Sequence, residues 1–280
     1  LTVTPPPPPL SQRTLRAHLV ALHTRRNIGG GPDERMHAGL APFQTLVMPV
    51  SVETQFAVTV KRAGRDVEAA AATTLVPPLA WPADGRDAVA AASRPGAMLR
   101  LGLISSDFGD HPVGHALLPW VRVLRQLRGL QVVCIASDSA EKAHAGTELR
   151  RALAAACGGL YDVTSLSDVE AARAISDLRV HVLINLVGHT AGSRHVVTQL
   201  APAPVQAMHY GYPATTAVPR MGYYQADVVA APPRLRRDYT ERLAYFPHSL
   251  FVAVHAHRYA GVAKAAAHAH PWYAASAGGR

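Results

Sequence analysis

Residues 98 to 255 alternate short apolar runs with amphipathic segments, and this alternation limits the possible folds more than any other feature. The run at 99–105 ends in small polar residues, as a buried parallel strand does at its carboxyl end. We expect further strands at 130–136, 159–163, 180–186, 205–209 and 226–230, and helices from Pro112 to Gly129, at 148–156 and at 168–178. The pattern predicts an α/β fold, a Rossmann-like parallel sheet with helices on both faces, over residues 96–255.

The residues before and after this region differ from it in composition and lack its alternation of apolar runs and amphipathic segments. Residues 1–95 read as an irregular, Pro- and Ala-rich approach with one or two helices, one of them expected at 10–23 after the proline run 5–9. Residues 256–280 are rich in Ala, His and Gly, and we expect an unstructured tail there. The 34-residue period of tetratricopeptide repeats is not visible in the first part.

The net charge of +9 raises the question of a nucleic-acid partner. The cations are scattered, however, and the densest groups, Arg25-Arg26 and residues 234–237, lack interleaved aromatic side chains for base stacking. No run of about 18 apolar residues suggests a membrane-spanning helix. Of the two cysteines, Cys134 lies in an apolar run, where a buried reduced thiol is the simpler expectation than a disulfide with Cys157.

Three loops that follow predicted strands carry unusual residues, at 105–112, 185–194 and 209–216. In the first, Pro112 can start a helix with His111 at its N-terminal cap. A helix N-terminus attracts anions and disfavours the imidazolium, so His111 could stay neutral and accept a hydrogen bond from a hydroxyl. The alternative is that Asp107, Asp110 and His111 only cap the helix. The second loop has glycines that let the backbone approach a ligand closely, or it is an ordinary strand-to-helix turn capped by Thr190 or Ser193. The third loop is either a turn or a wall of hydroxyl and aromatic groups suited to a sugar.

Other catalytic classes find little support. Asp107-Phe108-Gly109 matches the metal-binding triplet of protein kinases, but the other kinase motifs are missing. No Gly-x-Ser-x-Gly motif indicates a serine hydrolase. Fifteen histidines raise the question of a metal, yet the close pairs at 255/257 and 268/270 have no further ligand at a suitable spacing. We therefore predict no metal site.

Four blocks in the sequence resemble the catalytic region of the O-linked N-acetylglucosamine transferases, the family that includes the SPINDLY-type enzymes. The blocks are LRLGLISSDFGDHPVGH at 99–115, VHVLINLVGHTAGSR at 180–194, APVQAMHYGYPAT at 203–215 and YTERLAYFPH at 239–248. The resemblance covers about residues 98 to 252. It implies one N-terminal lobe of a two-lobed GT-B transferase.

The resemblance also implies a function. Family members move N-acetylglucosamine, or fucose in SPINDLY-type enzymes, from a nucleotide sugar to Ser or Thr hydroxyls of acceptor proteins, with inversion and no obligatory metal or other cofactor. The implied donor here is UDP-GlcNAc, the implied partners are acceptor proteins, and the implied location is the cytoplasm or nucleus. No nucleic-acid or membrane partner is expected.

Site residues carry over by motif. His111 and Asp107 correspond to catalytic positions, His111 beside the donor sugar; the substrate-binding positions are Asp110, Pro112, Val113, Tyr210, Gly211, Tyr212 and Pro213. Val113 stands where Thr is common, and Asp110 where Asn is. The second Rossmann lobe, which supplies most nucleotide contacts in the family, is not recognisable after about Phe251, so we expect an incomplete enzyme with negligible activity alone. The alternative is a non-catalytic nucleotide-sugar or protein-binding module derived from that lobe.

Overall fold

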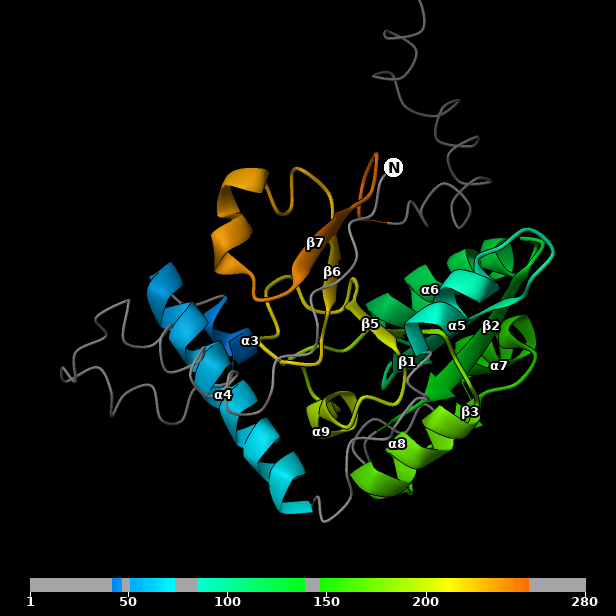
Figure 1. The fold of residues 1–280 in the computed structure, drawn as a ribbon, viewed down its shortest axis with the longest axis horizontal. Helices are drawn as coiled ribbons and strands as arrows, with labels where there is room; N and C mark the ends of the chain where they lie inside the picture. Colours follow the sequence, from blue (N-terminus) through cyan, green and yellow to red (C-terminus); the bar gives the residue numbers. More distant parts are fainter. Residues whose placement is uncertain (1–41, 47–50, 74–84, 139–146, 252–280) are drawn as a thin grey trace, which may run out of the picture.

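The structure is a computed structural model, and it describes residues 42–46, 51–73, 85–138 and 147–251. Within these residues, seven strands form one parallel sheet in the order β3-β2-β1-β4-β5-β6-β7 (Figure 1). The strands are β1 Leu99–Ser105, β2 Leu130–Ala136, β3 Tyr161–Asp162, β4 Val182–Asn185, β5 Val205–Met208, β6 Tyr223–Ala226 and β7 Arg242–Tyr245. The predicted open parallel sheet is confirmed.

Helices cover both faces of the sheet, as predicted. One face carries α6 Pro112–Leu124 and α7 Glu148–Cys157, and the other carries α8 Asp168–Asp177 and α9 His195–Gln199. Successive residues of β1 serve the two layers: Leu103 packs under α6 and α7, whereas Ile104 packs under α8 and α9. The central strands β1, β2, β4 and β5 are largely buried on both sides, which explains why they read as continuous apolar runs instead of alternating ones.

Local sequence sets the ends of these helices. α8 starts in a capping box, in which the Ser167 hydroxyl accepts from the Glu170 N–H and the Glu170 carboxylate accepts from the Ser167 N–H. α7 ends at Gly158, which takes the left-handed conformation. α6 includes Pro119 but ends at Leu124, five residues before the predicted stop at Gly129.

The N-terminal region differs most from the prediction. Within the expected irregular stretch lie α3 Pro42–Thr45, α5 Gly85–Ala92 and the 22-residue helix α4 Val52–Thr73. α4 runs beside α9 (Figure 1), and its Ala63 is buried in a cluster with Met208 and Tyr212. α4 is therefore part of the sheet domain, not an approach to it. The expected helix at 10–23 and the tail at 256–280 lie outside the described residues.

The last strands also needed correction. The strand expected at 226–230 is β6, three residues earlier, because the Asp227 carboxylate accepts from the backbone N–H groups of Val229 and Ala230 and turns the chain there. A 3-10 helix, Pro233–Asp238, then leads to β7, which the hydrophobic pattern did not predict. β7 is only four residues long and none of them is fully buried, so its apolar signal is weak.

The expectation of reduced cysteines is wrong. Cys134 of β2 forms a disulfide with Cys157 in the last turn of α7, with the Cα atoms 5.9 Å apart. Packing α7 on β2 brings together two residues that are 23 apart in the chain, which the sequence spacing could not show. None of the helices in the described part of the chain is long and apolar enough to cross a membrane.

Candidate functional site at the carboxyl edge of the sheet

The strand order places a topological switch point between β1 and β4. From β1 the chain continues to β2 on one side and later returns to β4 on the other. In open parallel sheets, ligands bind outside the carboxyl ends of the strands at such a point. The loops that follow β1, β4 and β5, which we call loop 1 (residues 106–111), loop 4 (186–194) and loop 5 (209–217), all leave this edge.

The three loops are packed against each other. A Cβ placed on Gly192 of loop 4 would lie 2.5 Å from the Cβ of Ser106 in loop 1, and the Ser106 hydroxyl donates to the Ala191 carbonyl. A Cβ on Gly211 of loop 5 would lie only 1.6 Å from the Leu186 carbonyl oxygen of loop 4. Glycine is required at these contacts because a Cβ would overlap the Ser106 side chain at Gly192 and the Leu186 backbone at Gly211. The loops therefore form one continuous wall.

Loop 1 delivers its side chains to the start of α6. Asp107 is buried, with 1% of its surface exposed, and the His111 side chain is 38% exposed. The His111 Nδ1 accepts from the Val113 N–H at 3.2 Å, which makes His111 the N-cap of α6. Gly114 lets α6 begin directly beneath the loop, since a Cβ there would meet the Gly109 carbonyl at 2.1 Å. The predicted cap is confirmed.

This cap constrains the chemistry of His111. Neutral imidazole has one acceptor nitrogen, and the cap uses it, so neutral His111 carries its proton on Nε2. In that form the ring donates a hydrogen bond, whereas the sequence argument expected it to accept one. The Asp107 carboxylate lies 3.7 Å from the same Nδ1. A shift of the proton to Nδ1 would pair it with Asp107 and turn Nε2 into a base, as in a His-Asp dyad.

The other predicted residues of loop 1 and α6 divide into two groups. Asp110 is exposed, and its carboxylate lies 2.8 Å from His115 Nε2 on the first turn of α6. Pro112 is exposed at the same helix end. Val113, by contrast, is 5% exposed and packs in the core under α6. Only the backbone of Val113 could line a ligand site, which corrects the predicted role of its side chain.

Loop 5 uses its side chains internally, and this corrects part of the predicted sugar wall. Tyr210 takes a positive φ of 64° and stays half-buried, while Pro213 is exposed. Tyr212, predicted to face the cleft, is completely buried beneath Gly188, and burial raises its pKa to about 12. The turn at Tyr210 directs the next aromatic side chain inward, toward α4.

The two threonines of loop 5 are also occupied. The buried Glu241 carboxylate accepts from the hydroxyls of Thr215 and Thr216 and from the Thr216 N–H, the latter at 2.7 Å. Glu241 precedes β7 and is 1% exposed. Sequence reasoning missed this residue, because a single Glu beside a weak strand gives no signal of burial. The hydroxyls fix the loop and do not face a ligand.

Loop 4 is a turn held by its own hydrogen bonds, but the expected cap is wrong: the N-cap of α9 is Arg194, which makes no side-chain cap hydrogen bond, and not Thr190 or Ser193. The Asn185 side-chain oxygen accepts from the N–H groups of Val187 and Gly188. Arg194 donates to the Asp168 carboxylate and to the Val163 and Leu166 carbonyls, which ties the end of loop 4 to the start of α8. The loop is thus a rigid support for its neighbours.

A second arginine that the sequence did not single out braces loop 1. Arg150 of α7 donates to the Asp138 carboxylate at 2.6 Å and to the Phe108 carbonyl at 3.1 Å. Asp138 follows β2, so Arg150 joins the ends of β1 and β2. Its signal in the sequence was hidden among many scattered arginines.

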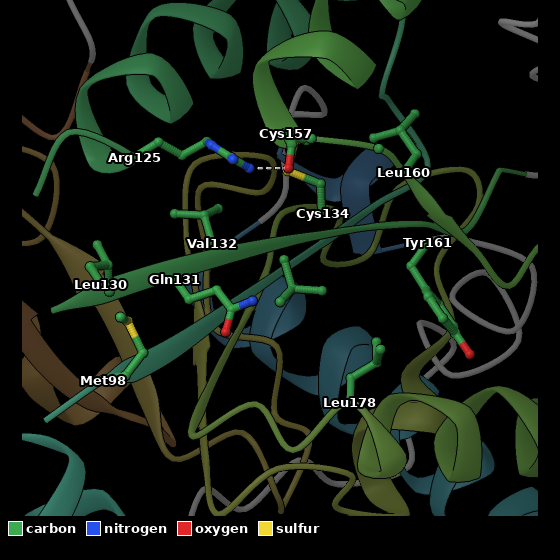
Figure 2. Close-up of a pocket in the computed structure, with 13 residues that line it drawn as sticks. Met98, Arg125, Leu130, Gln131, Val132, Cys134, Cys157, Leu160, Tyr161 and Leu178 are labelled. Carbon is green, nitrogen blue, oxygen red and sulfur yellow. Dashed lines mark hydrogen bonds between the residues drawn. A yellow bond between two sulfur atoms is a disulfide. The ribbon is translucent and has the colours of Figure 1, made fainter. Parts of the chain in front are cut away.

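Two surface pockets are possible locations of the site. One, of about 440 Å³, lies at the carboxyl edge beside loop 4 and is lined mainly by polar residues: Ser137, Asp138, Thr164, Leu166, Ser167, Asp168, Gly192, Ser193 and Arg194. The other, of about 790 Å³, lies near the amino ends of β1 and β2, beside the disulfide and the Arg125 side chain that donates to the Cys157 carbonyl (Figure 2). Although larger, it is on the edge away from loops 1, 4 and 5. We place the candidate site at the carboxyl edge.

One group of side chains in the described residues has the composition of a metal site: Asp66 of α4 with His189 of loop 4 and His195 of α9. Burial lowers the pKa of His189 to about 4 and that of His195 well below its usual value, so both rings are neutral at pH 7. Burial raises the pKa of Asp66. This group was not predictable from the sequence, because Asp66 lies far from the two histidines in the chain.

An open parallel sheet with polar loops at its switch point defines a Rossmann-like, ligand-binding lobe. The chain belongs to glycosyl transferase family 41, whose sequence profile matches residues 33–270. The match extends well before residue 98, in agreement with the packing of α4 onto the sheet.

Curated relatives agree with this assignment. The chain is 36% identical over 162 residues to a UDP-N-acetylglucosamine--peptide N-acetylglucosaminyltransferase of Caenorhabditis elegans, covering 58% of this chain and 14% of the relative. It is 33% identical over 154 residues to the probable enzyme SEC of Arabidopsis thaliana, covering 55% and 15%. The probable enzyme SPINDLY of Solanum lycopersicum matches at 29% over 152 residues, covering 54% and 16%. The chain thus spans about one seventh of the length of these relatives.

A solved structure supports the fold. A mutant of the Thermobaculum terrenum O-GlcNAc transferase superposes with a TM-score of 0.62 and 24% sequence identity, over 85% of this chain and 42% of that one. The architecture predicted from the resemblance is therefore shared with a protein of that name.

Proposed function

We propose that this chain is the N-terminal lobe of a protein O-glycosyltransferase that acts in the cytoplasm or nucleus. It would help transfer N-acetylglucosamine from UDP-GlcNAc to Ser or Thr hydroxyls of acceptor proteins. The observation that carries the proposal is the placement of Asp107 and His111 at the N-terminus of α6, beside the switch point of a family 41 sheet. No metal or other cofactor is part of the proposal.

The transfer reaction makes clear what this edge can contribute. The acceptor oxygen bonds to the anomeric carbon as the bond to the diphosphate breaks; the bonding electrons leave with UDP, and the hydroxyl proton passes to a base. The N-terminus of α6 favours the negative charge that develops on the leaving group. His111, with Nε2 protonated, can donate to a donor-sugar or diphosphate oxygen and so position the donor. The Asp107 carboxylate would stabilise the alternative tautomer, in which Nε2 receives the proton.

The first experiment measures binding. We expect UDP-GlcNAc to bind the 280-residue chain in isothermal titration calorimetry, and we expect His111→Asn to weaken binding at least about 10-fold, which corresponds to the loss of one hydrogen bond to a charged group. Asn retains a good N-cap, so this variant separates the contact from the cap. Asp177→Asn, at the far end of α8, is the control. Absence of UDP-GlcNAc binding, or equal binding by His111→Asn and wild type, contradicts the proposed role.

The second experiment concerns catalysis. We expect the isolated chain to transfer no label from UDP-GlcNAc to a Ser/Thr peptide, because one lobe supplies only part of the donor and acceptor walls. Robust turnover lost in His111→Ala would show that expectation to be wrong.

A non-catalytic nucleotide-sugar-binding module is the second candidate, favoured by loop 5, where Tyr212 is buried and Thr215 and Thr216 bind the Glu241 carboxylate instead of facing a ligand. A chimera distinguishes the two. Residues 51–251, which include α4, replace the matching segment of the Caenorhabditis elegans relative, and folding is checked by thermal melting and UDP binding. A folded chimera that transfers sugar supports the enzyme, whereas a folded chimera that binds UDP but does not transfer supports the binding module.

A further inference from the structure

Three side chains from distant parts of the sequence converge beneath loops 4 and 5. Asp66 comes from α4, His189 from loop 4 and His195 from the first position of α9, and one potential ligand atom of each lies within 4.8 Å of the others. The two imidazole rings stand edge to face, with 4.3 Å between their centroids. Neither histidine belongs to the site built from Asp107 and His111.

The cluster contains polar atoms that the described residues leave unsatisfied. His195 is 2% exposed, and neither of its ring nitrogens has a hydrogen-bond partner among those residues. The same is true of Oδ2 of Asp66, whose Oδ1 lies 3.5 Å from the Arg62 Nε. Buried polar groups without partners are rare and costly, and each one calls for an explanation.

The third residue is oriented like a metal ligand. His189 Nε2 lies 2.6 Å from the Thr216 carbonyl oxygen. A carbonyl only accepts, so Nε2 carries the proton and the Nδ1 lone pair is available. Histidines that bind metals donate their other ring N–H to a carbonyl or carboxylate in this way, which fixes the tautomer and the ring orientation.

We propose that Asp66, His189 and His195 form a binding site for a divalent first-row transition metal, with zinc as the best-suited ion. Two imidazole nitrogens and one carboxylate oxygen suit zinc, whereas magnesium and calcium prefer oxygen ligands. A tetrahedral zinc ion keeps its ligand atoms about 3.3 Å apart, given bonds of about 2.0 Å. Zinc binding therefore requires the three ligand atoms, now within 4.8 Å of one another, to move closer together.

The position of the site gives it a structural role. An ion there joins α4 to loop 4 and α9, and thereby fastens the N-terminal helix to the sheet domain. The neighbouring Arg62 would oppose a cation, but its side chain is 44% exposed and can turn away from Asp66. Because Thr216 belongs to loop 5, metal binding would also steady the His189 contact to that loop.

Zinc binding to the 280-residue chain tests the proposal. Four tail histidines, at 255, 257, 268 and 270, are first replaced by Ala, because they could bind zinc independently. After chelator treatment, we expect this chain to bind about one Zn²⁺ in a competition titration with a chromophoric chelator. X-ray absorption should show nitrogen and oxygen neighbours at about 2.0–2.1 Å and no sulfur. Saturating zinc should raise the melting temperature by about 5 to 10 °C.

Two variants and one control locate the site. His195→Leu should lose zinc affinity at least about 100-fold, and Asp66→Asn at least about 10-fold. Both should keep their fold without metal, because Leu fills the space of a ring whose nitrogens have no partner and Asn preserves the shape of Asp. His248→Gln, at an exposed histidine, should bind zinc as the parent does. Failure of the parent to bind zinc, or unchanged binding by folded His195→Leu and Asp66→Asn, would overturn the proposal.

Discussion

Loops 1 and 5 leave the same edge of the sheet and carry similar residues, yet they use them in opposite ways. Loop 1 keeps His111 and Asp110 at the surface around the end of α6. Loop 5 buries Tyr212 in the core and commits Thr215 and Thr216 to the Glu241 carboxylate. The polar composition of a loop therefore does not show whether its side chains face a ligand. The side chains of a loop are free to face a ligand only when no buried group from another part of the chain binds them.

The sharpest test of this contrast concerns the packing of loop 5. Gly211→Ala should destabilise the fold by at least about 4 kcal/mol, because its Cβ would overlap the Leu186 carbonyl and the backbone of loop 4 would have to move. Urea unfolding followed by circular dichroism measures the change. Gly64→Ala in α4 is the control, where the added Cβ meets nothing within 4 Å and should stabilise by up to about 1 kcal/mol. A cost below about 1 kcal/mol for Gly211→Ala would show that the two loops are not held together as described.

Glu241→Ala should cost about 4 kcal/mol, because it leaves two buried hydroxyls and a backbone N–H without their acceptor. Asp110→Asn in loop 1 should change stability by less than about 0.5 kcal/mol, since that side chain is exposed. Comparison of their unfolding free energies tests the contrast directly. If the two variants changed the unfolding free energy equally, the proposed contrast between loop 5 and loop 1 would be wrong.

The buried histidine of loop 5 should make the stability of the fold depend on pH. Burial among Trp120, Tyr210 and Phe246 lowers the pKa of His209 from 6.5 to about 4. The unfolded chain binds this proton more readily, so the stability contribution of the neutral ring is complete above about pH 6.5 and is lost as the pH falls toward 4. The loss amounts to about 3 kcal/mol. His209→Leu should make the stability profile less steep between these pH values, because one of the buried histidines no longer binds a proton on unfolding, while His189 and His195 still do. A profile that His209→Leu does not change would contradict the assignment.

The smallest effect belongs to loop 1. His111→Ala should destabilise the fold by about 1 kcal/mol through loss of the α6 cap, and His111→Asn should restore most of this. Thermal unfolding of the three proteins is the measurement. If His111→Ala costs as much as Glu241→Ala, then loop 1 depends on its side chains as heavily as loop 5 does.

The parallel sheet, most of its strands and the cap at His111 were predictable because each rests on short stretches of sequence. Apolar runs mark strands that are buried on both faces, and Pro112 marks the start of α6. The burial of Tyr212, the role of Glu241 and the pairing of Cys134 with Cys157 depend on contacts between distant segments. Local patterns carry no record of such contacts. α4 was missed for a related reason, since its Ala-rich end resembles low-complexity sequence while its buried residues meet the sheet only in the folded chain.

The packing of α4 against the second half of the sheet limits how far the N-terminus of the protein can be truncated. Deleting the residues before 96, where the strand and helix pattern begins, would remove α4. Met208, Tyr212 and Ala217, which are buried in the same cluster as Ala63 of α4, would then lose that contact. The shortened protein would expose a contiguous hydrophobic patch. We expect it to aggregate, so that its activity could not be measured.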